Sequence, residues 1–218
     1  MSSAEEGART RNGMRWRTDD LLDAAVLVFG ESGYHGATMN AITQRSTATK
    51  ATYYSRFGSK DDLYTACLHR EAERMRVHLV TAYESADVLS VSEQLEGDML
   101  AFFHHAATNP AGFMLLFGPE AAGPAARIRQ TLLDTIRDEV ARRVRRTLDA
   151  RHPHASASAD MIAAMIIGVA VHGTYQAVVV ERTSPERAGA MASSFVIAAL
   201  RNMEPGAIVY TTGSTAIE

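Results

Sequence analysis

The chain has 218 residues, of which 46% are hydrophobic and 22% are charged, a composition typical of a soluble globular protein. Its formal net charge of −3 excludes a generally basic, histone-like binder of nucleic acid. Because Cys67 is the only cysteine, an internal disulfide is excluded and a cytoplasmic location is expected. This length predicts one large domain, or a small domain joined to a larger one.

The N-terminal segment, residues 1–17, is small, polar and charged, which predicts a flexible arm without a signal-peptide core. Helical periodicity dominates from Thr18 onward and no sustained strand pattern occurs, so we expect an all-α fold. The first predicted helix runs from Thr18 to a stop signal at Gly33. Its apolar face consists of Leu22, Ala25, Val26 and Phe29.

Residues 38–60 predict a short helix, a tight turn and a second short helix. Thr38 and Thr49 can cap these two helices. The only two lysines of the chain, Lys50 and Lys60, lie in this segment. An exposed helix face with Lys, Thr, Tyr and Arg fits a phosphate backbone and can reach base edges in the major groove. This segment therefore favours DNA binding.

The distribution of charge agrees with that interpretation. The first 60 residues carry eight Lys and Arg against six Asp and Glu, so the remaining residues carry a net charge of −5. This asymmetry is typical of a local DNA footprint on a protein whose acidic body stays away from DNA.

The rest of the chain predicts a succession of helices separated by Pro, Gly and capping residues. Met161 to Val180 contains no formally charged side chain and is long enough to cross a membrane. Gly168, His172 and Gln176 interrupt it and no aromatic belt flanks it, which favours a helix buried between a core and a partner subunit. We therefore expect no membrane partner. The arginines at 142–146 predict a solvated helix face.

The segment from Arg17 to Tyr34, followed by Thr38 and by residues 52–63, resembles the TetR family of bacterial transcriptional regulators. The resemblance covers about the first third of the chain, and the remainder matches only as a run of helices. The positions that carry it are Ala24, Ala25, Phe29, Gly33, Tyr34, Thr38, Tyr54, Phe57, Lys60 and Leu63. The chain departs from the family at the turn, where Ser46-Thr47-Ala48 replaces the usual Ala-Gly-Val.

This resemblance implies a three-helix helix-turn-helix DNA-binding domain over residues 18–64 and a larger helical ligand-binding and dimerisation domain over 65–203. A tail over 204–218 shows no strong pattern. The implied partners are double-stranded operator DNA, a second copy of the chain and a small-molecule effector, with no cofactor and no catalytic residue. The implied homodimer would form through helices near 160–181 and 185–202, which are rich in small residues.

The resemblance also implies a set of DNA contacts. Lys50 is the best candidate for a base contact, since Lys can donate to guanine O6 and N7. Adjacent Tyr53 and Tyr54 point about 100° apart on a helix, so one can pack in the core while the other faces DNA. The predicted DNA-contacting residues are Arg17, Thr38, Thr49, Lys50, Thr52, Tyr53, Tyr54 and Lys60, with Arg15 as a further arm contact.

Aromatic and flexible apolar residues in the second half are suited to a ligand pocket, although ordinary core packing explains each of them alone. The candidate pocket residues are Phe102, Phe103, Phe113, Met114, Phe117, His172 and Tyr175. His172 also fits a satisfied core or interface histidine. No metal is expected, because adjacent His104 and His105 point apart on a helix and no paired-cysteine or His-Glu-x-x-His motif occurs.

The sequence thus favours a ligand-responsive regulator, most simply a repressor released from its operator by a small apolar or aromatic effector. One alternative is a helical enzyme that uses His104, His105 or His172, which would require an acid, base or nucleophile partner in a closed pocket. Another is a protein-interaction scaffold, which a core without any cavity would favour.

Overall fold

A computed structural model describes residues 16–85, 90–119, 124–149 and 158–203. Every regular element in these ranges is helical, which confirms the all-α prediction. The predicted arm, apart from Trp16 and Arg17, and the predicted tail lie outside the described residues.

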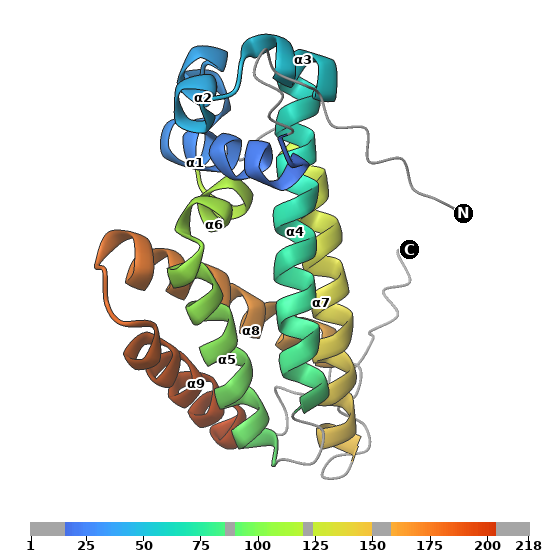
Figure 1. Cartoon of the computed structure of the whole chain (residues 1–218). Coiled ribbons are helices and arrows are strands. Elements are labelled where there is room, and N and C mark those ends of the chain that lie inside the picture. Colours follow the sequence, from blue (N-terminus) through green and yellow to red (C-terminus); the bar gives the residue numbers. More distant parts are fainter. Residues whose placement is uncertain (1–15, 86–89, 120–123, 150–157, 204–218) are drawn as a thin grey trace, which may run out of the picture. The chain divides into compact units, whose positions relative to one another are not determined.

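Contacts divide the chain into two compact units, the first from residues 1–77 and 108–130 and the second from 78–107 and 131–218. The predicted domain limit after residue 64 stays a prediction. The first unit (Figure 1) contains α1 (Thr18–Gly36), α2 (Met39–Ser46), α3 (Lys50–Phe57), α6 (Pro110–Phe117) and the N-terminal parts of α4 (Lys60–Ser85) and α7 (Pro124–Asp149). The second contains α5 (Val91–Thr108), α8 (Ala159–Thr174), a π-helical segment (Tyr175–Val180), α9 (Pro185–Asn202) and the remainders of α4 and α7.

Side-chain caps begin the helices of the first unit where the sequence predicts them. Thr38 Oγ1 accepts a hydrogen bond from the Ala41 amide at 3.1 Å, and Thr49 Oγ1 accepts one from the Thr52 amide at 3.2 Å. Each hydroxyl satisfies one of the unpaired amides at a helix start. The short helices α2 and α3 therefore begin at defined residues.

Helix α1 extends beyond its predicted end. Gly33 has φ 66° and ψ 174°, a conformation open to glycine, and the helix resumes after this kink up to Gly36. The four predicted apolar residues of α1 are all buried. The helix packs against α6, and a Cβ at Gly30 would lie 2.6 Å from the Ala111 carbonyl oxygen, so only glycine allows this approach.

A buried carboxylate joins three helices of the first unit. Glu71 of α4 is 1% exposed, and its Oε2 accepts a hydrogen bond from Asn109 Nδ2 at 2.6 Å. Asn109 in turn caps α6 through the Gly112 amide at 3.2 Å. Glu71 Oε1 lies 2.9 Å from Arg70 Nη2, while Arg70 Nη1 pairs with Asp23 of α1 at 2.9 Å. Glu71 thus links α4 to the start of α6 and, through Arg70, to α1.

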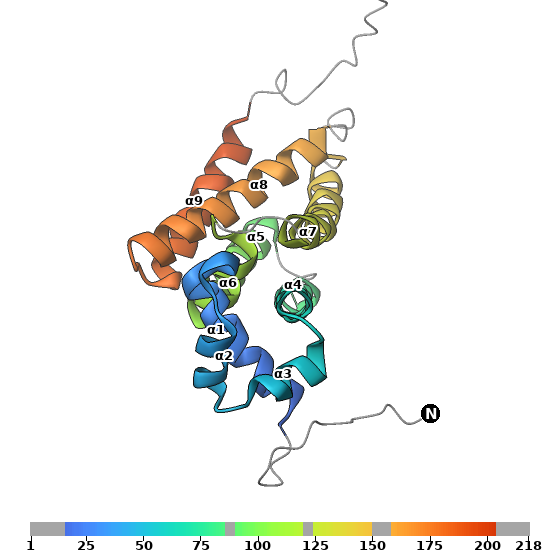
Figure 2. The same ribbon diagram turned by 90° about the horizontal axis from the view of Figure 1, so that it is seen from above.

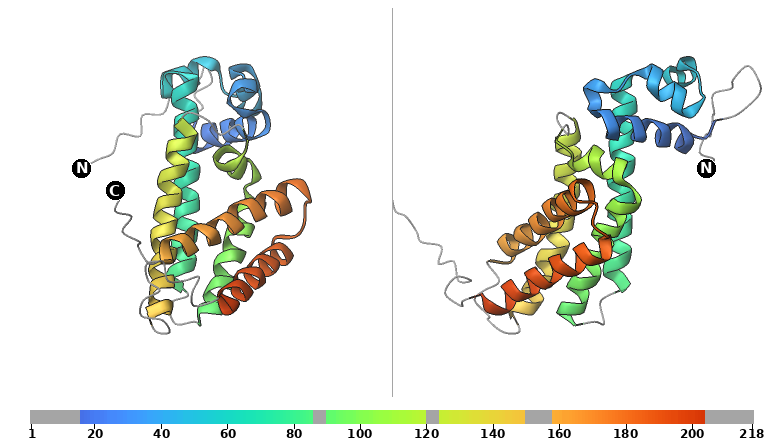
Figure 3. Two further views of the ribbon diagram at one scale, coloured as in Figure 1. Left: turned by 180° about the vertical axis from the view of Figure 1, so that it is seen from behind. Right: turned by 90° about the vertical axis from the view of Figure 1, so that its left-hand side faces the viewer.

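Helices α8 and α9 lie side by side in the second unit (Figure 3). By length and composition the run Ala159–Val180 could cross a membrane, but a single such helix is weak evidence because core helices of soluble proteins share these properties. The large exposed apolar side chains of these helices are Met161, Met165 and Val180 of this run and Met191 and Phe195 of α9, which we together call the α8–α9 face.

Candidate nucleic-acid interface and ligand cavity

The turn between α2 and α3 (Figure 2) uses no glycine. Thr47 adopts the left-handed conformation with φ 59°, which costs a non-glycine residue roughly 1 kcal/mol. The Ser46 hydroxyl offsets part of this cost, because Oγ accepts a hydrogen bond from the Ala48 amide at 3.2 Å. Buried Ala48 then anchors the turn before α3 begins.

Helix α3 has one buried face and one exposed face. Tyr53 is 1% exposed, and its hydroxyl donates to the Leu21 carbonyl oxygen at 3.0 Å. Tyr54 is 46% exposed, and Lys50 and Thr49 are also exposed. Tyr53 thus fixes α3 on α1 while the face with Thr49, Lys50 and Tyr54 is exposed.

Two predicted DNA contacts require correction. Tyr53 is buried in the core of the first unit, and Thr52 is only 4% exposed, with its hydroxyl bonded to Thr49 at 2.9 Å. Thr52 is two residues from both Lys50 and Tyr54, which places it on the other side of the helix, and Tyr53 is turned by about 100° from Tyr54. Their role is to position α3.

Three further predicted contacts lie at the edges of this surface. Thr38 is exposed at the start of α2, and the Arg17 side chain is 80% exposed before α1. Lys60 is half-buried at the start of α4, with Nζ 4.4 Å from the centre of the Tyr34 ring. This cation–π contact orients the ammonium group without neutralising it, so it remains able to attract a phosphate.

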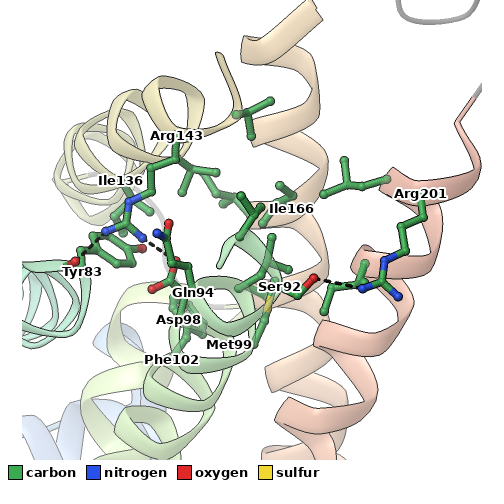
Figure 4. A pocket seen from close by; sticks show the side chains of 18 of the residues that line it. Tyr83, Ser92, Gln94, Asp98, Met99, Phe102, Ile136, Arg143, Ile166 and Arg201 are labelled. Carbon is green, nitrogen blue, oxygen red and sulfur yellow. Dashed lines mark hydrogen bonds and ion pairs between the residues drawn. The ribbon is translucent and has the colours of Figure 1, made fainter. Parts of the chain in front are cut away.

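A cavity of about 260 Å³ lies within the second unit (Figure 4). Side chains from α4, α5, α7, α8 and α9 line it, most of them apolar. The apolar wall includes Leu95, Met99, Phe102, Ile136, Val140 and Ile166. A mostly apolar cavity with a few polar groups is typical of a small-molecule site.

A cluster of polar residues faces one side of the cavity (Figure 4). Arg143 of α7 donates from Nη1 to Asp98 Oδ2 at 3.0 Å and from Nη2 to the Tyr83 carbonyl oxygen at 2.8 Å. Its guanidinium lies 4.5 Å from the centre of the Tyr83 ring. Burial raises the pKa of the Tyr83 hydroxyl, and burial also raises the pKa of Asp98 to about 6 against the opposing pull of Arg143.

The sequence-predicted pocket residues do not gather at this cavity. Phe102 lines it, whereas the other six predicted residues do not. Phe103 and Phe113 are buried core residues, and His172 is exposed. Met114, Phe117 and Tyr175 are half-buried, and Phe113 and Phe117 belong to α6 in the first unit. The aromatic residues of the predicted set therefore lie in the packed core more often than in the cavity wall.

Sequence reasoning missed Asp98 and Arg143. The sequence predicts a solvated face for Arg143, yet its side chain is only 11% exposed. A signal was present, since Arg143 lies three residues after Val140 and seven after Ile136, which places it beside their apolar stripe. Both of those residues line the same cavity.

The histidines of the enzyme alternative lie away from the cavity. His104 is exposed and its Nδ1 lies 3.8 Å from Glu186, while the His105 ring contacts the His78 ring at 5.0 Å. Neither these two nor His172 lines the cavity. Within the described ranges, no group of three or more potential metal-ligating side chains comes together. The presence of a cavity also weighs against a pure interaction scaffold.

The raised pKa of Asp98 predicts a pH dependence of stability. The folded protein holds this proton more tightly than the unfolded chain, in which the pKa is 3.8, so Asp98 stabilises the fold most at low pH. That contribution is lost as the pH rises through about 6. We expect the free energy of unfolding of wild type relative to Asp98→Asn to fall by roughly 1–3 kcal/mol between pH 4 and 7. Urea unfolding of both proteins across this range would measure it, and parallel pH profiles would contradict it.

The sequence of this chain is similar to those of known proteins. Residues 21–67 match the family described as bacterial regulatory proteins, tetR family. The HTH-type transcriptional activator FasR of Mycolicibacterium smegmatis is 29% identical over 134 residues, which span 58% of this chain and 59% of that protein. The chain thus matches less than two thirds of the length of this relative.

Solved structures share the fold. A TetR-like transcriptional regulator from Rhodococcus sp. RHA1 is 24% identical, with a TM-score of 0.69 over 89% of this chain and 100% of that one. SmeT, the repressor of the Stenotrophomonas maltophilia multidrug efflux pump SmeDEF, is 20% identical, with a TM-score of 0.64 over 84% of this chain and 90% of that one. Residues 21–67, which include the motif at 38–60, are thus similar to the tetR family of bacterial regulatory proteins, and the solved structures share the fold of the chain.

Proposed function

We propose that this protein is a cytoplasmic transcriptional regulator that binds operator DNA as a homodimer and changes its operator affinity when an apolar small molecule occupies the cavity. The observation that carries the proposal is the division of α3 into two faces. Buried Tyr53 holds the helix on α1, whereas Lys50 and Tyr54 of the same helix are exposed. Such a helix, supported by the two before it, is suited to the major groove.

The exposed groups of this surface have distinct proposed roles. Lys50, at the first residue of α3, donates to base edges, and guanine O6 and N7 are its best acceptors. Tyr54, Lys60 and Thr38 contact phosphates on either side, which sets the register of the helix. Arg17 extends toward the neighbouring minor groove, where narrow A·T-rich segments attract arginine.

The α8–α9 face supports the proposed homodimer. Met165, Met191 and Phe195 are 56%, 70% and 64% exposed, which is unusual for large apolar side chains on neighbouring helices. Ala164, Ala198 and Ala199 are also exposed, and such small residues allow helices to approach closely. A twofold dimer through this face would present two copies of α3 to half-sites about 35 Å apart.

The cavity supports the proposed response to an effector. Five helices contribute to its wall, so a ligand that fits only one arrangement of them shifts the equilibrium between arrangements. Coupling of roughly 1–3 kcal/mol would change operator affinity by about 5- to 150-fold. We propose that the effector releases a repressor from DNA; SmeT is described as a repressor, whereas FasR is named an activator. Reporter expression measured with and without effector decides between a repressor and an activator.

The DNA-binding surface predicts the outcome of a double substitution. Lys50→Ala with Tyr54→Ala should weaken operator binding by about 100-fold and reduce its dependence on salt, because phosphate and base contacts are lost from both subunits. Fluorescence anisotropy with duplexes from the DNA that flanks the protein's own gene would measure both effects. Neither side chain is buried, so the thermal unfolding midpoint should stay unchanged.

The matched control removes a cation elsewhere on the protein. Arg137→Ala changes a partly exposed residue of α7 that pairs with Asp134 at 2.9 Å, and it should leave operator affinity at the wild-type value. Equal binding by wild type, control and double variant on every duplex would show that α3 does not contact DNA.

A further inference from the structure

Asp98, which lines the cavity, has one buried carboxylate oxygen without a hydrogen-bond partner among the described residues. Its Oδ2 accepts the hydrogen bond from Arg143, whereas its Oδ1 is buried and has no hydrogen-bond partner among the described residues. The carboxylate lies on α5 and lines the cavity, next to Met99 and Phe102 (Figure 4). A buried acceptor without a donor costs free energy, so a ligand that supplies a donor removes that cost.

Arg143 does not serve as an anion site, because its nitrogens are already occupied. Nε donates to Glu139 at 3.2 Å, Nη1 to Asp98 at 3.0 Å and Nη2 to the Tyr83 carbonyl oxygen at 2.8 Å. The cluster therefore combines an unpartnered acceptor, Asp98 Oδ1, with a positive charge that is already paired. An anionic ligand group at this position would face a carboxylate oxygen and be repelled.

The other cation of the cavity is Arg201 of α9. It is exposed and donates to the Ser92 hydroxyl at 3.2 Å, away from the Arg143 cluster (Figure 4). Solvent screens a charge in that position more strongly than one in the cluster. The competing arrangement is a ligand whose carboxylate binds Arg201. Such a ligand would be an anion, in contrast to a hydroxyl or ammonium compound bound at Asp98.

We propose that the cavity accepts an apolar molecule whose head group donates a hydrogen bond to Asp98 Oδ1, either a hydroxyl or an ammonium group. The apolar body lies against Met99, Phe102, Ile136 and Ile166. This inference rests on the proposed role of the cavity as the effector site. It defines the effector class by its head group, an alcohol or amine as opposed to a carboxylic acid.

Three probes with the same chain test the head group: octan-1-ol, octylammonium and octanoate. Isothermal titration calorimetry of the full chain at pH 7.5 should show binding of octanol or octylammonium, with octanoate weaker by about tenfold or more. Preference for octylammonium over octanol identifies a cationic effector, and the reverse identifies a neutral one. Octanoate binding at least as tight as the other two, or no binding of any probe, would overturn the proposal.

Asp98→Asn provides a sharper test, because it exchanges an acceptor for a donor. With the asparagine oxygen kept toward Arg143, its amide NH2 takes the place of Oδ1. Affinity for octanol and octylammonium should fall by about tenfold while affinity for octanoate rises. Asp160→Asn changes an exposed aspartate of α8 outside the cavity and should leave all three affinities unchanged. An unchanged order of probes in Asp98→Asn, with a wild-type circular dichroism spectrum, would refute the role of Asp98.

Operator binding in the same samples separates this inference from the proposed function. A protein that binds its operator but none of the probes keeps the regulator function and loses the head-group assignment. A probe that binds through Asp98 without altering operator affinity keeps the assignment and rejects the effector role of the cavity.

Discussion

Replacing Phe195 by Glu should convert the proposed homodimer to a monomer and weaken operator binding by at least about 100-fold. Phe195 is 64% exposed on α9, between the exposed residues Met191 and Ala199 of the same helix face. In a twofold interface the substitution buries two carboxylates in an apolar contact, and each costs several kcal/mol unless it finds a partner. A monomer retains only one recognition helix per DNA molecule, so it loses the gain from binding two half-sites at once.

Light scattering coupled to size exclusion would report the mass, and fluorescence anisotropy would report the operator affinity. Since Phe195 is exposed in the single chain, the fold of each unit should be preserved, as judged by circular dichroism. Val77→Glu places the same charge on a 49% exposed position of α4 and should leave the dimer intact. A Phe195→Glu protein that keeps the dimer mass would exclude the α8–α9 face as the interface.

Replacing Glu71 by Ala should destabilise the protein by about 3–5 kcal/mol. The substitution leaves Arg70, whose side chain is 12% exposed, without its buried counter-charge and removes the acceptor of Asn109. Asn109 caps α6, so the loss extends from α4 to the start of α6 and its contact with α1. Such a cost is a large part of the stability of an ordinary domain.

Urea unfolding followed by circular dichroism would measure this loss, and a biphasic curve would show whether the first unit unfolds alone. Glu73→Ala is the matched control on the same helix, because Glu73 pairs with Arg76 at 2.7 Å in a solvent-exposed position. We expect little change in that variant, since exposed pairs contribute little. Equal midpoints for the two variants would show that the Glu71 network is not a source of stability.

The local features of the DNA-binding unit could be predicted from the sequence because short-range chemistry determines them. A Thr before an apolar run caps a helix whatever lies around it, and both Thr38 and Thr49 do so. The spacing of apolar residues in α1 likewise defines its buried face. The roles of Tyr53 and Tyr54 could not be separated in this way, because both are tyrosines on one helix. The packing of α3 on α1, where Tyr53 bonds to Leu21, decides which of them is exposed.

The residues that line the cavity could be predicted from the sequence far less well than the helix caps, because the tertiary structure decides them. Aromatic residues were the reasonable candidates from composition, yet Phe103 and Phe113 fill the core, and Phe102 alone of the predicted set reaches the cavity. Asp98 and Arg143 are 45 residues apart in the chain and meet only because α5 and α7 pack together within the second unit. Periodicity and capping residues thus determined the helices and their starts, since these follow from neighbours along the chain. The packing of distant helices decided which side chains enclose the cavity, because a cavity wall is built from residues that sequence spacing does not bring together.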